Sequence, residues 1–88
     1  MSVLIRFAPK DLTTQQYDEA ISKLGDENPD GRELHVCFGE DGSLRVSEVW
    51  DSREQFAAFG ERLMPILAEV GIDPGEPEFI EVHRVFAR

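Results

Sequence analysis

The sequence predicts an α+β fold in which strand, helix, strand, strand, helix and strand follow one another, the ferredoxin-like βαββαβ order. Four short stretches alternate apolar and polar residues, and two longer stretches carry apolar residues at helical spacing. Turn-forming residues separate these stretches. With 88 residues, the chain has room for one domain, residues 1–88, with a single small core.

The first half of the chain predicts a strand over residues 3–7 and then a helix. Apolar and polar residues alternate in the strand, and Pro9, which cannot donate a hydrogen bond to a sheet, ends it. Thr13 and Gln16 have the spacing of a capping box, which starts a helix. Gly25 ends this helix. The apolar stripe of the helix consists of Tyr17, Ala20, Ile21 and Leu24.

A hairpin is predicted in the middle of the chain. Residues 34–38 and residues 44–50 both alternate in polarity, and the segment GEDG at residues 39–42 provides a tight turn between them. The preceding segment DENPDGR, residues 26–32, is rich in turn-forming residues. It predicts a solvated loop that is too short to separate two domains.

The third strand leads directly into a second helix. Asp51 or Ser52 is the expected N-cap, because each is followed three residues later by a Glu or Gln. Pro65 is expected to bend the helix or divide it near residues 62–63, which leaves either a gap beneath the helix or a simple curve over the sheet. After Gly71 and a Pro- and Gly-rich loop, a last strand is predicted from Phe79 to Phe86. The apolar stripe of this helix is Phe56, Phe59, Leu63, Ile66, Leu67 and Val70.

These elements predict a four-stranded antiparallel sheet with the first and third strands in the centre and both helices on one face. If the hairpin loop holds an odd number of residues, the helix-facing side chains are Val3, Ile5, Phe7, Leu34, Val36, Phe38, Leu44, Val46, Trp50, Ile80, Val82 and Phe86. The opposite face then carries Leu4, Arg6, His35, Cys37, Arg45, Ser47, Val49, Phe79, Glu81, His83 and Val85. Since that face is too apolar to lie in water, a second copy of the chain is expected to cover it.

The charge balance limits the partners. Nine basic and eighteen acidic side chains give a net charge of −9, which opposes binding to nucleic acid or to an anionic membrane. No apolar stretch approaches the thickness of a bilayer, and no signal peptide is indicated. Cys37 is the only cysteine, so we expect a buried thiol, no disulfide framework and a cytoplasmic protein. The expected partners are a small molecule and a second copy of the chain.

The residues of the third strand and second helix carry a family resemblance. The string EVWDSREQF, residues 48–56, at a strand-to-helix junction, resembles the dimeric α+β barrel superfamily and, within it, the antibiotic biosynthesis monooxygenase-like (ABM-like) branch. The resemblance implies a homodimeric α+β barrel whose two sheets face each other, with a small pocket between helices and sheet in each subunit. Because the superfamily includes monooxygenases, lactone isomerases, haem degraders and proteins without known activity, the fold transfers better than the chemistry.

The sequence departs from the haem-degrading members. Where these have an axial histidine, the helix has Phe59 and Gly60, and Arg6 stands where they have an asparagine. We therefore expect no haem and no other cofactor. Trp50 is retained, and the resemblance implies that it lines a pocket for a flat polycyclic substrate, as in the monooxygenases. The alternative is a tryptophan that anchors the core.

Two histidines are candidate site residues. His35 and His83 fall on the same predicted sheet face as Arg6, Arg45 and Glu81. His35, in mid-strand between apolar neighbours, is the expected catalytic base for an activated carbon-bound or phenolic proton. The alternative is an ion-paired network that only satisfies buried polar atoms. Histidines on separate strands without a matching Cys or Asp do not indicate a metal site. The inward carboxylate Glu48 is expected to reach the sheet edge or to pair with Arg84.

Two functions remain open. In the first, the protein binds a small apolar or aromatic metabolite between sheet and helices without converting it. In the second, it is a cofactor-independent monooxygenase or isomerase of aromatic or polyketide-like substrates, with His35 as the base. A module that serves only assembly is a third possibility. The expected pocket residues are Tyr17, Trp50, Phe56, Phe59 and His83.

Overall fold

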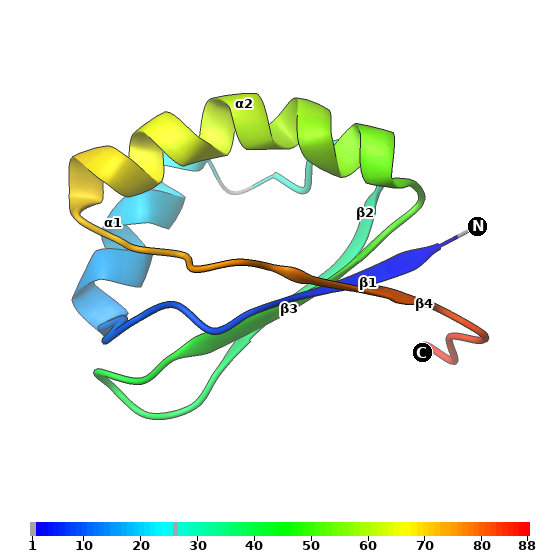
Figure 1. Cartoon of the computed structure of the whole chain (residues 1–88), viewed down its shortest axis with the longest axis horizontal. Coiled ribbons are helices and arrows are strands. Elements are labelled where there is room, and N and C mark those ends of the chain that lie inside the picture. Colours follow the sequence, from blue (N-terminus) through cyan, green and yellow to red (C-terminus); the bar gives the residue numbers. More distant parts are fainter. Residues whose placement is uncertain (1, 26) are drawn as a thin grey trace.

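The computed structural model describes residues 2–25 and 27–88, which form one antiparallel sheet with both helices on the same face (Figure 1). The strand order is β2-β3-β1-β4, so the first and third strands are central. This arrangement confirms the predicted ferredoxin-like fold. The elements are β1 (Val3–Phe7), α1 (Thr14–Leu24), β2 (Arg32–Phe38), β3 (Arg45–Trp50), α2 (Arg53–Val70) and β4 (Glu78–Glu81).

Both helices begin at the predicted caps. Thr13 and Gln16 form the complete capping box of α1. Of the two candidates for α2, Ser52 is the N-cap, and its hydroxyl accepts a hydrogen bond from the Gln55 amide at 3.2 Å. α2 continues through Pro65 without a division, so of the two expected outcomes the bend is the one observed, and Figure 1 shows the helix curving over the sheet. A proline removes only one amide donor, and the remaining helical bonds hold the curve.

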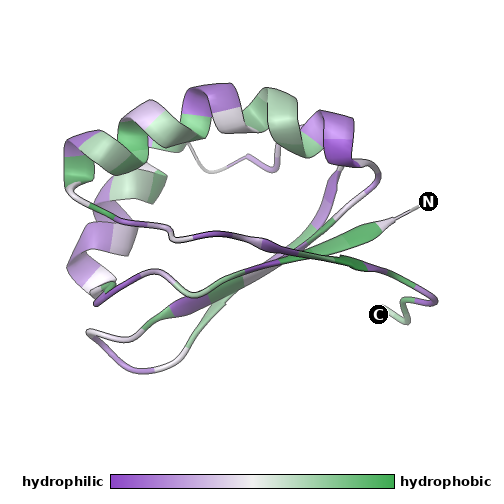
Figure 2. Cartoon of the chain, in the orientation of Figure 1, coloured by the Kyte–Doolittle hydropathy of each residue, from purple (hydrophilic) through white to green (hydrophobic). Residues whose placement is uncertain are grey.

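The central strands place their inward side chains as predicted. Val3 pairs with Trp50 and Ile5 pairs with Glu48 in the antiparallel register of β1 and β3. Ile5 and Trp50 are fully buried beneath the helices. In Figure 2 most of β1 has the hydrophobic colour, whereas both helices mix hydrophobic and hydrophilic segments. This is the pattern of a central strand covered by amphipathic helices.

The predicted faces of β2 are wrong. His35 pairs with Glu48 and Cys37 pairs with Val46, so these side chains face the helices. The pairing of β2 with β3 runs up to Phe38 and Arg45, which leaves residues 39–44, an even number, in the hairpin loop. The prediction assumed an odd number, and a change of one residue in register moves every side chain of a strand to the other face. The side chains that point away from the helices are Leu34, Val36 and Phe38, and they are 47%, 40% and 43% exposed.

β4 is also reversed relative to the prediction, and it is shorter. Phe79 pairs with Ile5 and therefore faces the helices, where its ring meets that of Phe56 at 5.8 Å. Ile80 pairs with Leu4 on the opposite face. The strand ends at Glu81, and the predicted core residue Phe86 is 85% exposed. The irregular loop after α2 carries no periodic signal that could have set the register of β4.

The buried core consists of two separate clusters. One joins Leu12, Ala20, Leu44 and Ile72, and the other joins Val3, Ile5 and Trp50 with the half-buried Phe7, Phe56 and Phe59. Both clusters lie between the helices and the sheet. The space between them is not completely filled by side chains, and it forms the cavity described next.

Candidate functional site

A cavity of about 80 Å³ lies between the two helices and the sheet. It joins the two core clusters, because Leu12 and Ala20 line it from the first and Phe7 and Phe59 from the second. Most of its wall is apolar, as in ordinary ligand sites. The further apolar lining includes Ile21, Leu24, Leu63, Leu67 and Ile72.

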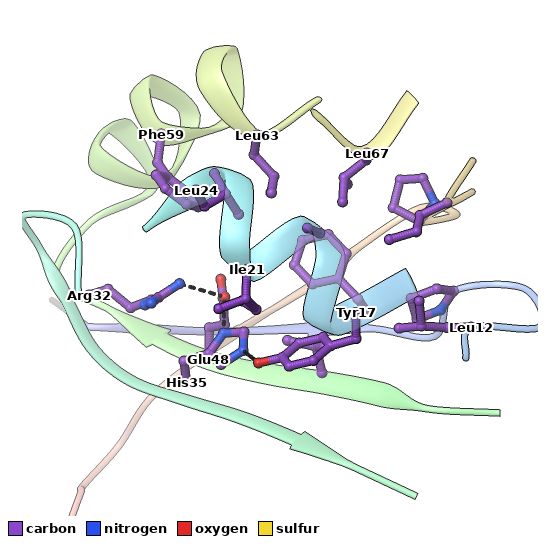
Figure 3. Close-up of a pocket in the computed structure, with 16 residues that line it drawn as sticks. Leu12, Tyr17, Ile21, Leu24, Arg32, His35, Glu48, Phe59, Leu63 and Leu67 are labelled. Carbon is purple, nitrogen blue, oxygen red and sulfur yellow. Dashed lines mark hydrogen bonds and ion pairs between the residues drawn. The ribbon is translucent and has the colours of Figure 1, made fainter. Parts of the chain in front are cut away.

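The polar groups of the cavity gather on one wall (Figure 3). Tyr17 comes from α1, Arg32 and His35 come from β2, and Glu48 comes from β3. The Tyr17 hydroxyl lies 2.7 Å from His35 Nε2, and His35 Nδ1 lies 2.5 Å from Glu48 Oε2. A continuous hydrogen-bonded chain therefore runs from a phenol through an imidazole to a carboxylate.

A β-bulge at Glu33 brings Arg32 and His35 to the same face. Arg32 pairs with Trp50, Leu34 pairs with Val49, and the register shifts between these two pairs. In a regular strand, Arg32 and His35 would point to opposite faces, because they are three positions apart. The bulge corrects this parity, because Glu33 and Leu34 together oppose Val49, and re-aiming a side chain beside a functional site is a common role of bulges.

Glu48 is the anchor of the chain. It is only 3% exposed, and it accepts hydrogen bonds from Arg32 at 3.2 Å and from the Trp50 indole at 2.9 Å, in addition to His35. Burial by itself raises the pKa of Glu48. The hydrogen bonds that Glu48 accepts from His35 and Trp50, together with the positive charge of Arg32, outweigh burial and lower this pKa. Glu48 is therefore ionised at neutral pH.

The ionised carboxylate determines the tautomer of His35. Glu48 can only accept, so Nδ1 carries the proton, and Nε2 is left with a lone pair that accepts from the Tyr17 hydroxyl. Burial, followed by the nearby Cys37 thiol, raises the pKa of Tyr17, so the phenol keeps its proton. A carboxylate that orients a histidine whose other nitrogen faces a hydroxyl is the arrangement of hydrolase triads, with a phenol in place of serine.

The structure brings together some of the predicted site residues and separates others. His35, Tyr17 and Phe59 line the cavity. Trp50 and Phe56 pack against each other in the core, with ring centroids 5.7 Å apart, and are not part of the lining. His83 lies beyond β4 and is exposed.

Two further predictions about polar residues are wrong. His35 does not share a sheet face with Arg6 and Arg45, for the parity reason given above. Glu48 pairs with Arg32 and His35, and not with Arg84. Arg84 follows the end of β4, and its guanidinium lies over the ring of Phe86.

Arg32 is the site residue that sequence reasoning missed. It belonged to the predicted loop over residues 26–32, whereas it is the first residue of β2 and donates to both Asn28 and Glu48. Alternation alone gives no sign of a bulge. The inward position of Glu48 was a usable signal, because a buried carboxylate requires a cation or several donors nearby.

Comparisons with known proteins were made for the sequence and for the structure. No family model and no curated protein sequence matches the chain. Its structure is similar to the crystal structure of a Deinococcus radiodurans protein described as a candidate antibiotic biosynthesis monooxygenase. The TM-score is 0.63 at 10% sequence identity, over 100% of this chain and 98% of that one. This chain has an ABM-like fold.

At this identity, the likeness of the two ABM-like chains extends to the fold alone. Within residues 2–25 and 27–88, no group of three or more His, Cys, Asp or Glu side chains is arranged to hold a metal ion. Neither α1 nor α2 is long and apolar enough to cross a bilayer.

Proposed function

We propose that the protein binds a small, largely apolar molecule in this cavity and removes a proton from it with His35 as the base. The observation that carries the proposal is the hydrogen bond between His35 Nδ1 and the ionised Glu48, which leaves Nε2 as the basic atom on the cavity side. Removing a proton needs no cofactor when the resulting anion is conjugated. This reaction is the first step expected of a cofactor-free monooxygenase or isomerase of aromatic or polyketide-like substrates.

Glu48 lies beside the imidazole that is proposed to take up the proton. When Nε2 takes a proton, the new imidazolium lies beside the carboxylate of Glu48 in a buried wall, where opposite charges attract strongly. The remainder of the cavity wall is mostly apolar. The description of the D. radiodurans protein as a monooxygenase is consistent with this chemistry.

The second candidate is binding without conversion. Two observations favour it: every buried side-chain nitrogen and oxygen of the described residues has a hydrogen-bond partner, and the cavity of about 80 Å³ is small beside common ligand sites of about 300–1,000 Å³. Under both candidates, the ligand is a single-ring or short-chain molecule and not a polycyclic one.

We also propose that the protein functions as a homodimer through the sheet face opposite the helices. One apolar row, Ile80, Leu4, Val49 and Leu34, crosses all four strands on that face. Its ends, Leu34 and Ile80, are 47% and 41% exposed, and exposed apolar surface of this kind marks an interface. A cytoplasmic location, supported by the unpaired Cys37, belongs to the same proposal.

The proposal is tested by deuterium exchange of enolisable compounds that are uncharged at neutral pH, such as small cyclic ketones, followed by NMR in deuterated buffer. The wild type is expected to accelerate exchange above the buffer rate. His35→Gln, which keeps side-chain hydrogen bonds, is expected to lose about 100-fold or more of that acceleration, the usual size of a general-base contribution. His83→Gln, which changes the exposed histidine, is the matched control and should exchange like the wild type. Acceleration that survives His35→Gln would refute the proposed base.

A further inference from the structure

We propose that Tyr17 contacts the ligand and passes its proton to His35, and that the ligand is an uncharged molecule with an acidic hydroxyl, a phenol or an enol. This inference rests on the proposed function, in which His35 is the base, and it names the residue that the ligand touches and the class of ligand.

Tyr17 covers the basic nitrogen of His35, Nε2. Its hydroxyl lies 2.7 Å from Nε2, and its ring is nearly parallel to the imidazole, with an interplanar angle of 20°. Because Nε2 has one lone pair, and that pair already accepts from Tyr17, a ligand cannot donate to His35 directly. The Tyr17 oxygen itself can accept a hydrogen bond, and no other described residue occupies it.

A proton can pass from the ligand through Tyr17 to His35 without any movement of these side chains. The O–H bond of the ligand breaks, and its proton forms a new O–H bond on the Tyr17 oxygen. In the same step the original Tyr17 proton moves to Nε2 of His35. The products are the ligand anion, a neutral Tyr17 and an imidazolium that is hydrogen-bonded to Glu48. The raised pKa of Tyr17 favours a neutral phenol at both ends of the step.

The charges in the cavity wall favour an uncharged ligand. The charged side chains in the cavity wall are Arg32 and the ionised Glu48, which pair with each other at 3.2 Å. Arg32 is also bound to Asn28 and lies 5.7 Å from the centre of the Phe59 ring. The lining therefore offers no free cation to a ligand that arrives as an anion, and burying an unpaired charge is costly. A neutral acid avoids this cost, because its negative charge appears together with the imidazolium.

A ligand hydroxyl is better suited than a C–H group to give its proton to Tyr17. An O–H group can donate a hydrogen bond to the Tyr17 oxygen and so align the proton before it moves. A C–H group forms only weak hydrogen bonds. An enol satisfies the relay and also gives carbon exchange, because its anion can take up deuterium at carbon.

The test uses three single-ring compounds of similar size: 4-nitrophenol, its methyl ether and 4-nitrobenzoate. Visible absorbance distinguishes the phenol from the phenolate, so ionisation in the bound state is observed without turnover. The wild type should lower the apparent pKa of bound 4-nitrophenol by about one unit or more, which is about tenfold in the ionisation equilibrium. It should bind 4-nitrobenzoate at least tenfold more weakly.

Two variants separate the inference from the proposed function. Tyr17→Phe keeps the ring and should bind 4-nitrophenol in its neutral form, and His35→Gln should do the same. If Tyr17→Phe still ionises the bound phenol whereas His35→Gln does not, His35 acts directly and the relay is wrong. If His35→Gln also ionises it, or the wild type binds without ionising it, the proposed base is wrong as well.

The three compounds are compared on the wild-type protein, so this test does not depend on the folding of a variant. Binding of 4-nitrobenzoate as tight as that of 4-nitrophenol would overturn the inferred preference for uncharged acids. Equal binding of the methyl ether would overturn the role of the ligand hydroxyl. Absence of binding of all three compounds would overturn both the ligand class and the use of this cavity.

Discussion

Glu48 connects the stability of the protein with the proposed chemistry. Buried carboxylates are uncommon in small domains, and they persist where donors and cations surround them. The donors here come from Arg32 and His35 on β2 and from Trp50 on its own strand. The same side chain therefore fixes the edge strand β2 to the sheet and sets the orientation of the proposed base.

We expect Glu48→Gln to destabilise the protein by about 3 kcal/mol, because it leaves Arg32 as a buried cation without its counter-ion. Urea unfolding at neutral pH measures this change. Glu61→Gln, an identical substitution at an exposed position of α2, is the control and should change the free energy of unfolding very little. A loss at Glu48 no larger than at Glu61 would show that the ion pair does not hold the fold.

The lowered pKa of Glu48 gives this contribution a pH dependence. A carboxyl group whose pKa is lower in the folded state stabilises the protein above its unfolded pKa, and the stabilisation is lost as the pH falls through the folded value. The difference in stability between wild type and Glu48→Gln should therefore be full at neutral pH and shrink on acidification. Urea midpoints across the acidic range measure it, and a difference that grows toward low pH would contradict the assignment.

At the scale of elements, the bulge in β2 is what unites the site. Its extra residue, Glu33, is exposed and bonds only the Ser2 hydroxyl among the described side chains, so its contribution comes from its backbone and not from its side chain. If Glu33 were instead paired regularly in the ladder, Arg32 would point to the outer face and Glu48 would lose its guanidinium partner. The bulge therefore lets the strand hold this extra residue without breaking the polar network drawn from α1, β2 and β3.

Deletion of Glu33 should remove the bulge and leave Arg32 directly before Leu34, still opposite Trp50 and facing the helices. It should therefore cost much less stability than Arg32→Gln, which separates a buried ion pair at a cost of about 3 kcal/mol. Glu33→Ala is the matched control: it removes the same side chain but keeps the residue count and the bulge, and it should stay near wild-type stability. Urea unfolding of the three variants measures the effect. A loss from the deletion as large as that from Arg32→Gln would contradict the inference that Arg32 keeps its inward position without the bulge.

The elements themselves could be predicted from the sequence, because their signals are local. Alternation, the capping residues Thr13 and Ser52 and the terminal glycines Gly25 and Gly71 each depend on a few neighbouring residues, and all six elements formed in the predicted order, with β2 longer and β4 shorter than predicted. The faces of β2 and β4 could not be predicted. They depend on loop parity and on a bulge, and neither leaves a mark in the periodicity.

The candidate site shares this limit. His35 was identified from its position among apolar neighbours, but its partners come from other elements. Tyr17 reaches it from α1 and Glu48 from β3, and only the register places the three in a row. Trp50 shows the opposite case: its fully buried position matches the alternative of a core anchor.

At the scale of the whole molecule, the corrected faces make the outer surface of the sheet more apolar than predicted. Leu34, Val36 and Phe38 lie there instead of His35 and Cys37. The predicted homodimer thus gains apolar area, and the titratable site residues move to the enclosed side under the helices. The two proposed features, the interface and the cavity, use opposite faces of one sheet.

Phe38→Glu is expected to weaken a dimer by more than tenfold, because it places a charge within the apolar surface of the proposed interface. Sedimentation velocity over a micromolar concentration series measures the change. Phe86→Glu, the same substitution at an 85% exposed position in the C-terminal segment, is the control and should sediment like the wild type. A wild type that sediments as a monomer at all these concentrations would remove the proposed dimer.

The even number of residues in the hairpin loop, residues 39–44, restricts how the chain can diverge. Insertion or deletion of one residue in this loop would move every side chain of β2 to the opposite face of the sheet. His35 would then be exposed to solvent, and Phe38 would be buried. Homologues that keep this histidine should differ in hairpin length by two residues or none, unless a second bulge restores the phase. Aligned natural variants with odd length changes, the same histidine and a regular β2 would contradict this evolutionary constraint.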